Sequence, residues 1–114
     1  ETKTPQNPTE PELKAKVREI VYRQMASTSL TANMLADSLY ISRAKLYYEW
    51  KKVSEVSIND FINEIRITEG KVLIKERGFS VQEAANAVGF SNPNYFSTSF
   101  KKQFGYSPSE IKER

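Results

Sequence analysis

The chain has 114 residues, enough for one modest domain or for two very small subdomains that share a spacer. It has no cysteine and no histidine, which excludes disulfides and thiolate metal sites and removes the commonest general base and metal ligand. The net charge of +3 makes it mildly basic, and neither an apolar stretch of membrane-spanning length nor a signal peptide is visible. We therefore expect a protein from a reducing compartment, with no metal and no cofactor.

The first eleven residues are predicted to be a tether. Residues 1–11 are polar and contain three prolines, a composition typical of a linker or a disordered segment. The chain also begins at Glu1 without a methionine, so we expect this piece to lie C-terminal to something else in a larger protein. An artefact of how the chain was produced is the alternative interpretation, and the residues alone leave it open.

Three amphipathic helices are predicted in the next part of the chain. They should cover about residues 12–25, 31–39 and 42–53, with Thr31 and Ser42 as N-caps. Their apolar stripes consist of Leu13, Val17, Ile20, Val21 and Met25, then Met34, Leu35 and Leu39, and then Leu46, Trp50 and Val53. Each set recurs at helical spacing, so the three helices can pack their apolar sides together.

A longer helix should connect the two parts of the chain. It begins near Ser57 and ends before Gly78, with a predicted apolar stripe of Phe61, Ile62, Ile65, Val72 and Leu73. Such a helix is roughly 28 Å long, close to the roughly 34 Å of one DNA turn, so it could space two reading heads. Gly70 should cost about 1 kcal/mol of helix stability relative to alanine, and close packing or a bend would explain it.

The last part of the chain contains its most informative motif. Ser80 and Glu83 form an S-x-x-E capping box that starts a helix, and Gly89 permits the left-handed backbone that ends it. Asn92 is a good N-cap for the next helix, and Pro93 takes its first position. This helix carries one apolar face of Phe96, Phe100 and Phe104. A further short helix is predicted from a second capping box at residues 107–110, anchored by Ile111.

The chain partly repeats itself when residues 30–58 are placed on residues 79–108. Leu30-Thr31 falls on Phe79-Ser80, Ala36 on Ala85 and Ile41 on Phe90; after one inserted residue, Leu46 falls on Phe96, Trp50 on Phe100, Lys51-Lys52 on Lys101-Lys102 and Ser57 on Ser107. Chance alignment of two amphipathic helices is the alternative, and the shared caps and the aromatic before Lys-Lys make it the weaker one. Each copy is predicted to be a helix, a short turn and a second helix.

The second helix of each copy carries polar residues suited to a nucleic acid. In a helix-turn-helix this helix enters the major groove, so it needs an apolar side for its own domain and a polar side for the bases. The candidate DNA-binding residues that the pattern singles out are Ser42, Arg43, Lys45, Tyr47, Tyr48, Lys51 and Lys52, and then Asn92, Asn94, Ser97, Thr98, Lys101 and Lys102. From Ser42 to Lys52 four cationic side chains oppose only Glu49, which leaves a local charge of +3.

Different roles are expected within this set. Ser42 and Asn92 can offer backbone amides to a phosphate, and the two lysine pairs can clamp phosphates without sequence choice. Arg43 can take guanine, while the tyrosines can contact thymine methyl groups or a phosphate. The plain alternatives stay open: lysines at helix C-termini are often only solvated, and Tyr47 is equally suited to the rim of the core.

The second copy resembles the second helix-turn-helix of the AraC/XylS transcriptional regulators. The matching residues are Gly89-Phe90-Ser91, Tyr95-Phe96, Phe100-Lys101-Lys102, Gly105 and Ser107-Pro108, and with the first copy and Phe61…Arg66 the resemblance covers about residues 12–114. It implies seven helices in two subdomains, with both reading helices in successive major-groove segments on one DNA face. By position the readers are Arg43, Ala44, Tyr47 and Tyr48, and then Pro93, Asn94, Ser97 and Thr98.

The first copy is also similar to the output domains of bacterial hybrid two-component regulators, through Ile41-Ser42-Arg43…Leu46-Tyr47. The sequence departs from the family pattern with Tyr40 and Glu55 where the family usually has glycine, and with Ile58 in place of proline. Pro93 and Thr98 stand where other members often carry longer readers. These departures bear on base contacts and little on the fold.

The prediction is an all-α fold with a tether at 1–11, a first helix-turn-helix subdomain at 12–56, a connecting helix at 57–77 and a second subdomain at 78–114. Its expected function is sequence-specific binding of double-stranded DNA and transcriptional regulation in the bacterial cytoplasm, without enzymatic activity. RNA polymerase or other transcription machinery is an expected partner, and a membrane is not. A helical protein–protein interaction module is the alternative, which would show an exposed apolar groove in place of basic reading faces.

Overall fold

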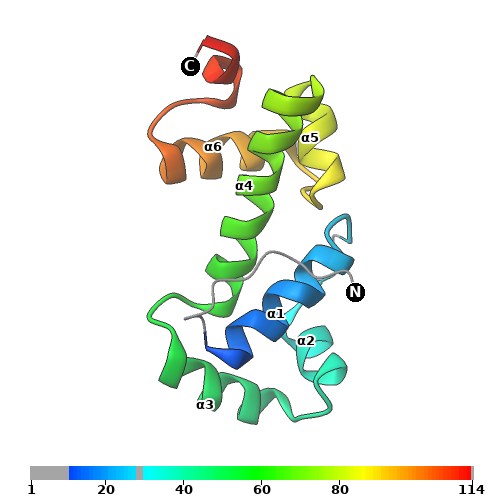
Figure 1. Ribbon diagram of the computed structural model, residues 1–114, viewed down its shortest axis with the longest axis vertical. Helices are drawn as coiled ribbons and strands as arrows, with labels where there is room; N and C mark the ends of the chain where they lie inside the picture. Colours follow the sequence, from blue (N-terminus) through cyan, green and yellow to red (C-terminus); the bar gives the residue numbers. More distant parts are fainter. Residues whose placement is uncertain (1–10, 28–29, 114) are drawn as a thin grey trace. The chain divides into compact units, whose positions relative to one another are not determined.

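The computed structural model describes residues 11–27 and 30–113. In these residues all regular structure is helical, with six α-helices and one final 3₁₀ helix, so the all-α prediction is confirmed (Figure 1). The elements are α1 (Glu12–Arg23), α2 (Ala32–Ser38), α3 (Arg43–Val53), α4 (Ile58–Arg77), α5 (Val81–Ala87), α6 (Pro93–Phe104) and η1 (Pro108–Glu113). The predicted tether lies outside the described residues, apart from Pro11.

The chain folds into two compact units. The first contains α1, α2, α3 and the start of α4 up to Ile62. The second contains residues 25–27 and the chain from Asn63 onward, with the rest of α4, α5, α6 and η1. Each unit has a helix-turn-helix of its own, formed by α2 and α3 in the first and by α5 and α6 in the second.

The first unit is built around one tryptophan. Trp50 on α3 is buried, and its ring meets the ring of Phe61 edge to face, with 4.9 Å between centroids. Its indole Nε1–H donates to the carbonyl oxygen of Val56 at 2.8 Å, so the polar atom of this buried ring has a partner. Around it lie the buried residues Val17, Ile20, Val21, Leu30, Ala32, Leu35, Ala36, Leu46, Ile58 and Ile62. Each of the first three predicted apolar stripes thus contributes buried residues to this unit: Val17, Ile20 and Val21, then Leu35, and then Leu46 and Trp50.

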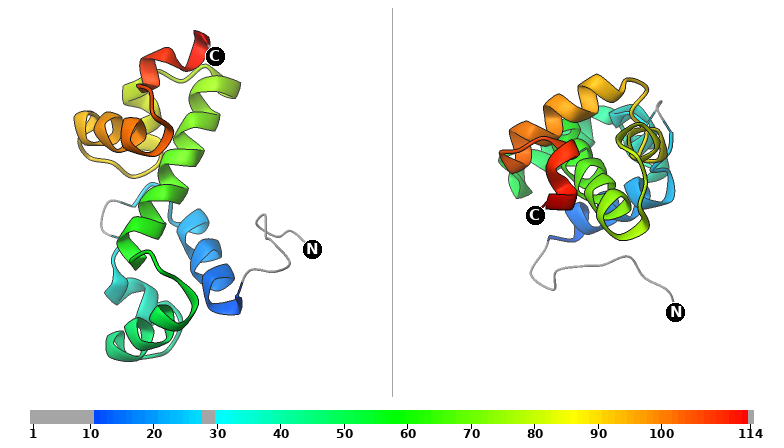
Figure 2. Two further views of the ribbon diagram at one scale, coloured as in Figure 1. Left: turned by 90° about the vertical axis from the view of Figure 1, so that its left-hand side faces the viewer. Right: turned by 90° about the horizontal axis from the view of Figure 1, so that it is seen from above.

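The second unit has an aromatic core. Phe96 and Phe100 on α6 are fully buried, and their neighbours in this core are Ile67, Ile74, Ala84, Ala85, Val88, Phe90 and Ile111. The two alanines of α5 keep that helix close to α6 because they have almost no side chain. In both views of Figure 2, η1 lies beside the C-terminal half of α4, and buried Ile111 anchors it there.

The two helix-turn-helix motifs begin and turn in the same way. Thr31 caps α2 and Ser80 caps α5, and in the second case Glu83 completes the predicted capping box. At the turn, Ile41 N–H donates to the carbonyl of Ala36 at 3.1 Å, while the equivalent Phe90 and Ala85 make the same bond at 2.9 Å. The repeat seen in the sequence is therefore also present in backbone hydrogen bonds.

A residue with positive φ stands at the same place in each turn. Gly89 has φ of 95°, and Tyr40 has φ of 59°. For tyrosine this left-handed conformation costs about 1–2 kcal/mol, because its Cβ crowds the following carbonyl oxygen. Such a backbone satisfies the carbonyls at a helix C-terminus, which explains why the turn needs it even where glycine is missing.

Three local predictions differ from the structure. Val72, expected on the apolar stripe of α4, is 41% exposed, and Ile67 and Ile74 are buried instead. Helix α1 ends at Arg23, so Met25 lies beyond it and packs against the core of the second unit. The last element is a six-residue 3₁₀ helix, and at its start Glu110 N–H donates to the carbonyl of Ser107, three residues earlier, at 3.0 Å.

Arg66 is buried although it is charged. Its side chain is only 7% exposed, and Nη2 donates to the carbonyl oxygen of Ser27 within the second unit. Burial lowers the pKa of this guanidinium from its ordinary value. Among the described residues its Nε has no hydrogen-bond partner. Arg66, on α4, thus holds the segment that precedes α2 by a hydrogen bond to a backbone carbonyl oxygen. Within the same described residues no acidic partner is shown for it.

Candidate nucleic-acid interface

Helix α3 has one buried side and one exposed side. Leu46 is fully buried, and together with Trp50 it fixes the helix to the first unit. The predicted readers Arg43, Ala44, Tyr47 and Tyr48 are all exposed, with Tyr47 at 40% and Tyr48 at 63%. The two large aromatic side chains are solvated on a helix whose other side is packed, so this surface is free for a ligand.

The cationic groups of α3 lie against its tyrosines. The guanidinium carbon of Arg43 is 5.8 Å from the ring centre of Tyr47, and Nζ of Lys52 is 4.3 Å from that of Tyr48. Nη1 of Arg43 also makes a long hydrogen bond, 3.5 Å, to Oδ1 of Asn33 on α2. These contacts hold positive charge over an exposed aromatic strip, which combines phosphate attraction with flat rings for apolar contact.

The start of α3 is fixed by Ser42. Its hydroxyl accepts from the backbone N–H of Lys45 at 3.1 Å, as predicted for an N-cap. At the other end of the helix Lys51 and Lys52 are exposed, and Lys52 is 3.6 Å from Oε2 of the partly exposed Glu49. This surface pair reduces the charge of the helix slightly and contributes little to stability.

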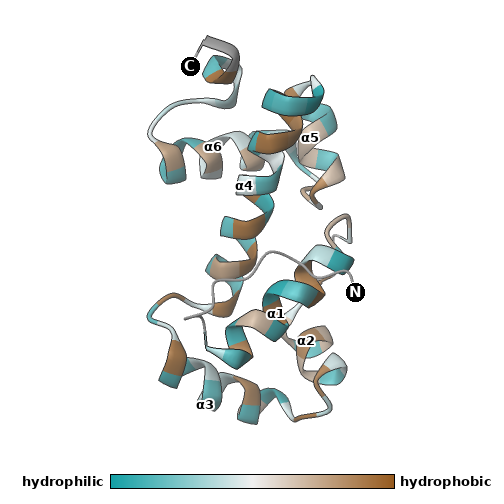
Figure 3. Cartoon of the chain, in the orientation of Figure 1, coloured by the Kyte–Doolittle hydropathy of each residue, from teal (hydrophilic) through white to brown (hydrophobic). Residues whose placement is uncertain are grey.

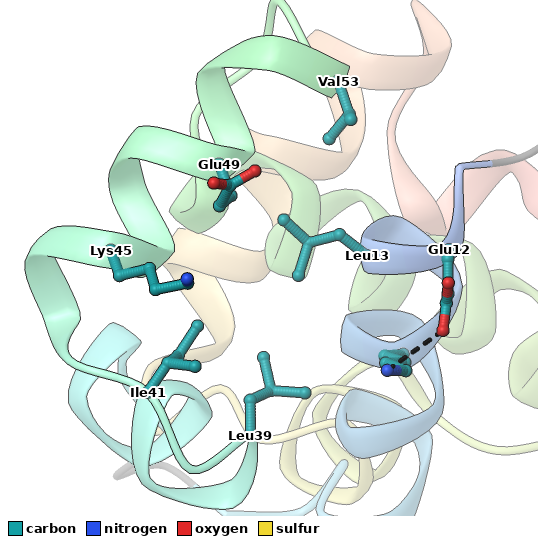
Figure 4. Close-up of a pocket in the computed structure, with 8 residues that line it drawn as sticks. Glu12, Leu13, Leu39, Ile41, Lys45, Glu49 and Val53 are labelled. Carbon is teal, nitrogen blue, oxygen red and sulfur yellow. Dashed lines mark ion pairs between the residues drawn. The ribbon is translucent and has the colours of Figure 1, made fainter.

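The exposed Lys45 and the partly exposed Glu49 also line a hollow beside α3. The hollow, about 280 Å³, lies in the first unit between α1 and α3 (Figure 4). Its walls consist of Glu12, Leu13, Lys16, Leu39, Ile41, Lys45, Glu49 and Val53, and Glu12 pairs with Lys16 at 3.1 Å. Because both signs of charge line it, the hollow does not suit a phosphate.

Helix α6 has the same division into sides but a different surface chemistry. Phe96 and Phe100 are buried, whereas the predicted Asn94, Thr98, Lys101 and Lys102 are exposed and Pro93 and Ser97 are half-buried. No acidic residue occurs within the helix. Figure 3 shows hydrophilic and hydrophobic residues alternating along both α3 and α6. Short polar side chains near the start of α6 can approach base edges closely, and the lysines near its end can contact phosphates.

Asn92 and Tyr95 fix the beginning of α6. Oδ1 of Asn92 accepts from the backbone N–H of Asn94 at 2.8 Å, and Pro93 takes the first helical position as predicted. Tyr95 is 54% exposed, its ring lies edge to face on Phe90, and its hydroxyl accepts a long hydrogen bond, 3.4 Å, from Asn63. Phe96 therefore lies in the core, and Tyr95 braces the turn from its surface.

Two residues near the interface were not among the sequence candidates. Asn33 touches Arg43, and nothing in the helical spacing of α2 distinguishes it from other exposed positions. Tyr40, three residues before α3, has a left-handed backbone. The internal repeat contains a signal for it, because Tyr40 falls on Gly89 when the two copies are aligned.

No metal site is formed by the described residues, in which three or more histidine, cysteine, aspartate or glutamate side chains do not come together. Within the same residues no helix combines the length and the apolar character that crossing a bilayer requires. Exposed cationic and polar side chains occur on α3 in the first unit and on α6 in the second.

The comparison with known families decides what these paired motifs are. A family model described as a helix-turn-helix domain matches residues 35–114. The chain belongs to the AraC-type helix-turn-helix family. As an AraC-type domain it is a DNA-binding domain of the class found in transcriptional regulators.

Individual relatives agree with this assignment. The Msm operon regulatory protein of Streptococcus mutans serotype c is 36% identical over 97 residues, which cover 85% of this chain and 34% of the relative. The AraC-type chain therefore spans about a third of that curated relative. The crystal structure of a DNA-binding transcriptional dual regulator from Escherichia coli K-12 matches with a TM-score of 0.86 and 26% identity over 96% of both chains.

A further solved structure is the C-terminal domain of the two-component response regulator yesN from Fusobacterium nucleatum subsp. nucleatum. It has a TM-score of 0.78 and 25% identity, and the match covers 90% of this chain and 99% of that domain. The AraC-type fold of this chain is thus shared with domains that have been solved in isolation.

Proposed function

We propose that both helix-turn-helix motifs of this AraC-type domain bind double-stranded DNA sequence-specifically, with α3 and α6 as the helices that enter the major groove. The observation that carries the proposal is the twofold recurrence of one arrangement: a capped helix with a buried apolar side, an exposed polar side and a Lys-Lys pair near its end. Phosphate contacts would supply affinity, and a few base contacts from each helix would supply sequence choice.

The two helices divide the reading between two chemistries. On α3, Arg43 is suited to the two acceptors of guanine, and Tyr47 and Tyr48 to thymine methyl groups or a phosphate. On α6 the proposed readers have shorter side chains: Pro93, Asn94, Ser97 and Thr98. Ala44 is a further proposed reader on α3, also with a short side chain. The proposed phosphate contacts are Ser42, Lys45, Lys51 and Lys52, and then Asn92, Lys101 and Lys102. Exposure of most of these side chains supports the proposal.

We place the domain boundaries as the sequence predicts them, with the first motif in 12–56, the connecting helix in 57–77 and the second motif in 78–114. In the parent protein this domain would be the C-terminal output module of a bacterial hybrid two-component regulator. The similarity to the C-terminal domain of a two-component response regulator supports that assignment. It would act in the cytoplasm, with RNA polymerase or other transcription machinery as a second partner and without enzymatic activity.

The test is a selection of bound duplexes from a random pool, carried out with the 114-residue chain and with two variants. One variant lacks the polar side of α3 through Arg43→Ala and Tyr47→Ala, and the other that of α6 through Asn94→Ala and Thr98→Ala. The wild type should recover two blocks of preferred bases, and each variant should lose one block. Recovery of duplexes without any preferred bases would refute sequence-specific reading.

A further inference from the structure

Tyr40 combines an unfavourable backbone with a fully solvated side chain. In the described part of the chain every other residue with positive φ is a glycine. The side chain of Tyr40 is 94% exposed, more than any other large hydrophobic residue there. A left-handed backbone is unfavourable for a bulky residue, and a ring in solvent gains no packing in return. The first helix-turn-helix thus carries a residue that its own fold does not favour.

The equivalent residue of the second motif has a structural explanation that Tyr40 lacks. A Cβ on Gly89 would lie 2.4 Å from the carbonyl oxygen of Met25 and 3.0 Å from the guanidinium of Arg66, so only glycine fits there. The exposure of Tyr40 shows that its side chain meets no such wall. Glycine would satisfy the turn at both places, so the choice of tyrosine calls for a role outside the folded domain.

We propose that Tyr40 is a DNA-backbone contact whose phenol donates a hydrogen bond to a phosphate oxygen beside the bases bound by α3. The inference rests on the proposed function, since it assumes that α3 lies in the major groove. Tyrosine is among the side chains that bond phosphate oxygens in protein–DNA complexes. Contacts of this kind position a protein on the duplex and are indifferent to sequence.

The surroundings favour DNA over a protein partner. Tyr40 stands three residues before α3, and from Asp37 to Tyr48 the chain has two cationic residues, Arg43 and Lys45, against one acidic residue, Asp37. A polyanion is attracted to this segment, whereas an apolar protein surface would have to desolvate its charges. The single acceptor that a phenol needs is abundant along the phosphate backbone.

Two variants separate the proposed contact from a role in folding. Tyr40→Gly relieves the backbone and should leave the melting temperature unchanged or raise it, while the affinity for DNA falls by about tenfold. Tyr40→Phe keeps the ring and the backbone and removes only the hydroxyl, so it should show the same loss. Both variants should lose as much affinity for a duplex of random sequence as for one recovered by selection, because a phosphate contact carries no sequence information.

Salt dependence and a modified duplex identify the atom that is contacted. Tyr40 is uncharged, so its loss should leave the dependence of affinity on salt unchanged, whereas Lys101→Ala should lower that slope by about one. Neutral methylphosphonates can replace the phosphates of the duplex one at a time. At one position the replacement should weaken binding by the wild type and leave binding by Tyr40→Phe unchanged.

The outcomes separate this inference from the proposed function. If Tyr40→Gly binds like the wild type while Arg43→Ala and Lys101→Ala bind more weakly, the Tyr40 contact is refuted and the DNA-binding surface stands. If none of the three weakens binding, the proposed function itself fails. A lower melting temperature in Tyr40→Gly, wild-type affinity in Tyr40→Phe, or a loss confined to the selected duplex would each overturn the phosphate contact.

Discussion

Gly70 on α4 lies directly against the ring of Phe96 on α6. A Cβ built on Gly70 would come within 2.7 Å of both Cε1 and Cζ of that ring, closer than real side chains approach each other. Phe96 is fully buried, so its ring has no room to withdraw. The glycine in the middle of a long helix therefore serves close packing, one of the two explanations that the sequence leaves open.

Gly70→Ala should destabilise the protein although alanine is the better helix former. The gain in helix propensity is about 1 kcal/mol, whereas forcing a methyl group into a packed core typically costs about 1–3 kcal/mol. We expect a lower free energy of unfolding in a denaturant titration. The loss should shrink when Phe96→Leu is introduced as well, because the smaller side chain makes room. Equal losses in both backgrounds would contradict the proposed clash.

Phe100→Ala should unfold the second unit or leave it marginally stable. Removing a buried aromatic ring of this size typically costs about 3–5 kcal/mol. The chain has a single tryptophan, Trp50, in the first unit, so its fluorescence reports that unit while helical circular dichroism reports both. Phe104→Ala, which removes a half-buried ring in contact with Phe100, should cost less. An unchanged melting curve in Phe100→Ala would disprove the core assignment.

Arg43→Ala and Lys101→Ala should weaken DNA binding in different ways. Loss of a base contact by Arg43 should cost about 1–3 kcal/mol for the selected duplex and little for a random one. Loss of a phosphate contact by Lys101 should weaken binding to all duplexes alike. The difference in affinity between wild type and Lys101→Ala should become smaller as salt is raised. Lys75→Ala on α4 makes the same change in net charge and serves as the control. Fluorescence anisotropy at several salt concentrations measures all three, and identical behaviour of the first two would show that the contacts are wrongly assigned.

Glu83→Gln should change the pH dependence of stability. The hydrogen bond from the backbone N–H of Ser80, together with that of its side chain, lowers the pKa of Glu83 below its ordinary value of 4.5. A carboxyl group with a lowered pKa in the folded state stabilises the fold fully above its unfolded pKa. That contribution is lost as the pH falls through the pKa that Glu83 has in the folded state.

The free energies of unfolding of wild type and Glu83→Gln, measured from neutral pH into the acid range, should therefore converge below about pH 4.5. The remaining carboxylates are the same in both proteins, so they cancel in the difference. A difference that stays constant over the whole range would mean that the capping box does not depend on the charge of Glu83.

Much of the fold could be read from short-range patterns. The caps at Thr31, Ser42, Ser80 and Asn92 are side chains that bind a backbone N–H two or three residues away, so their sequence signals are complete within one turn. The repeat was visible for the same reason. The choice of candidate readers used helical spacing, which separates exposed from buried positions but does not say which exposed residue meets DNA, so those contacts stay a prediction.

Val72 shows where the sequence was insufficient. It follows a helical spacing that fits the stripe of α4, yet it is exposed, because the direction of burial on a long helix depends on which helices pack against it. The sequence also gave no sign that Arg66 is buried, since charged residues are normally solvated and its acceptor, the carbonyl of Ser27, lies far away in the chain.

By itself, then, the sequence determined an all-helical fold, the side-chain caps at Thr31, Ser42, Ser80 and Asn92, two copies of one motif and the type of side chain that each copy exposes. These depend on interactions within about four residues along the chain. Only the tertiary structure decided that Gly70 packs against the ring of Phe96, that Arg66 donates to the carbonyl of Ser27 and that Tyr40 is exposed to solvent. Such features depend on residues that are distant in sequence and meet only after the helices pack.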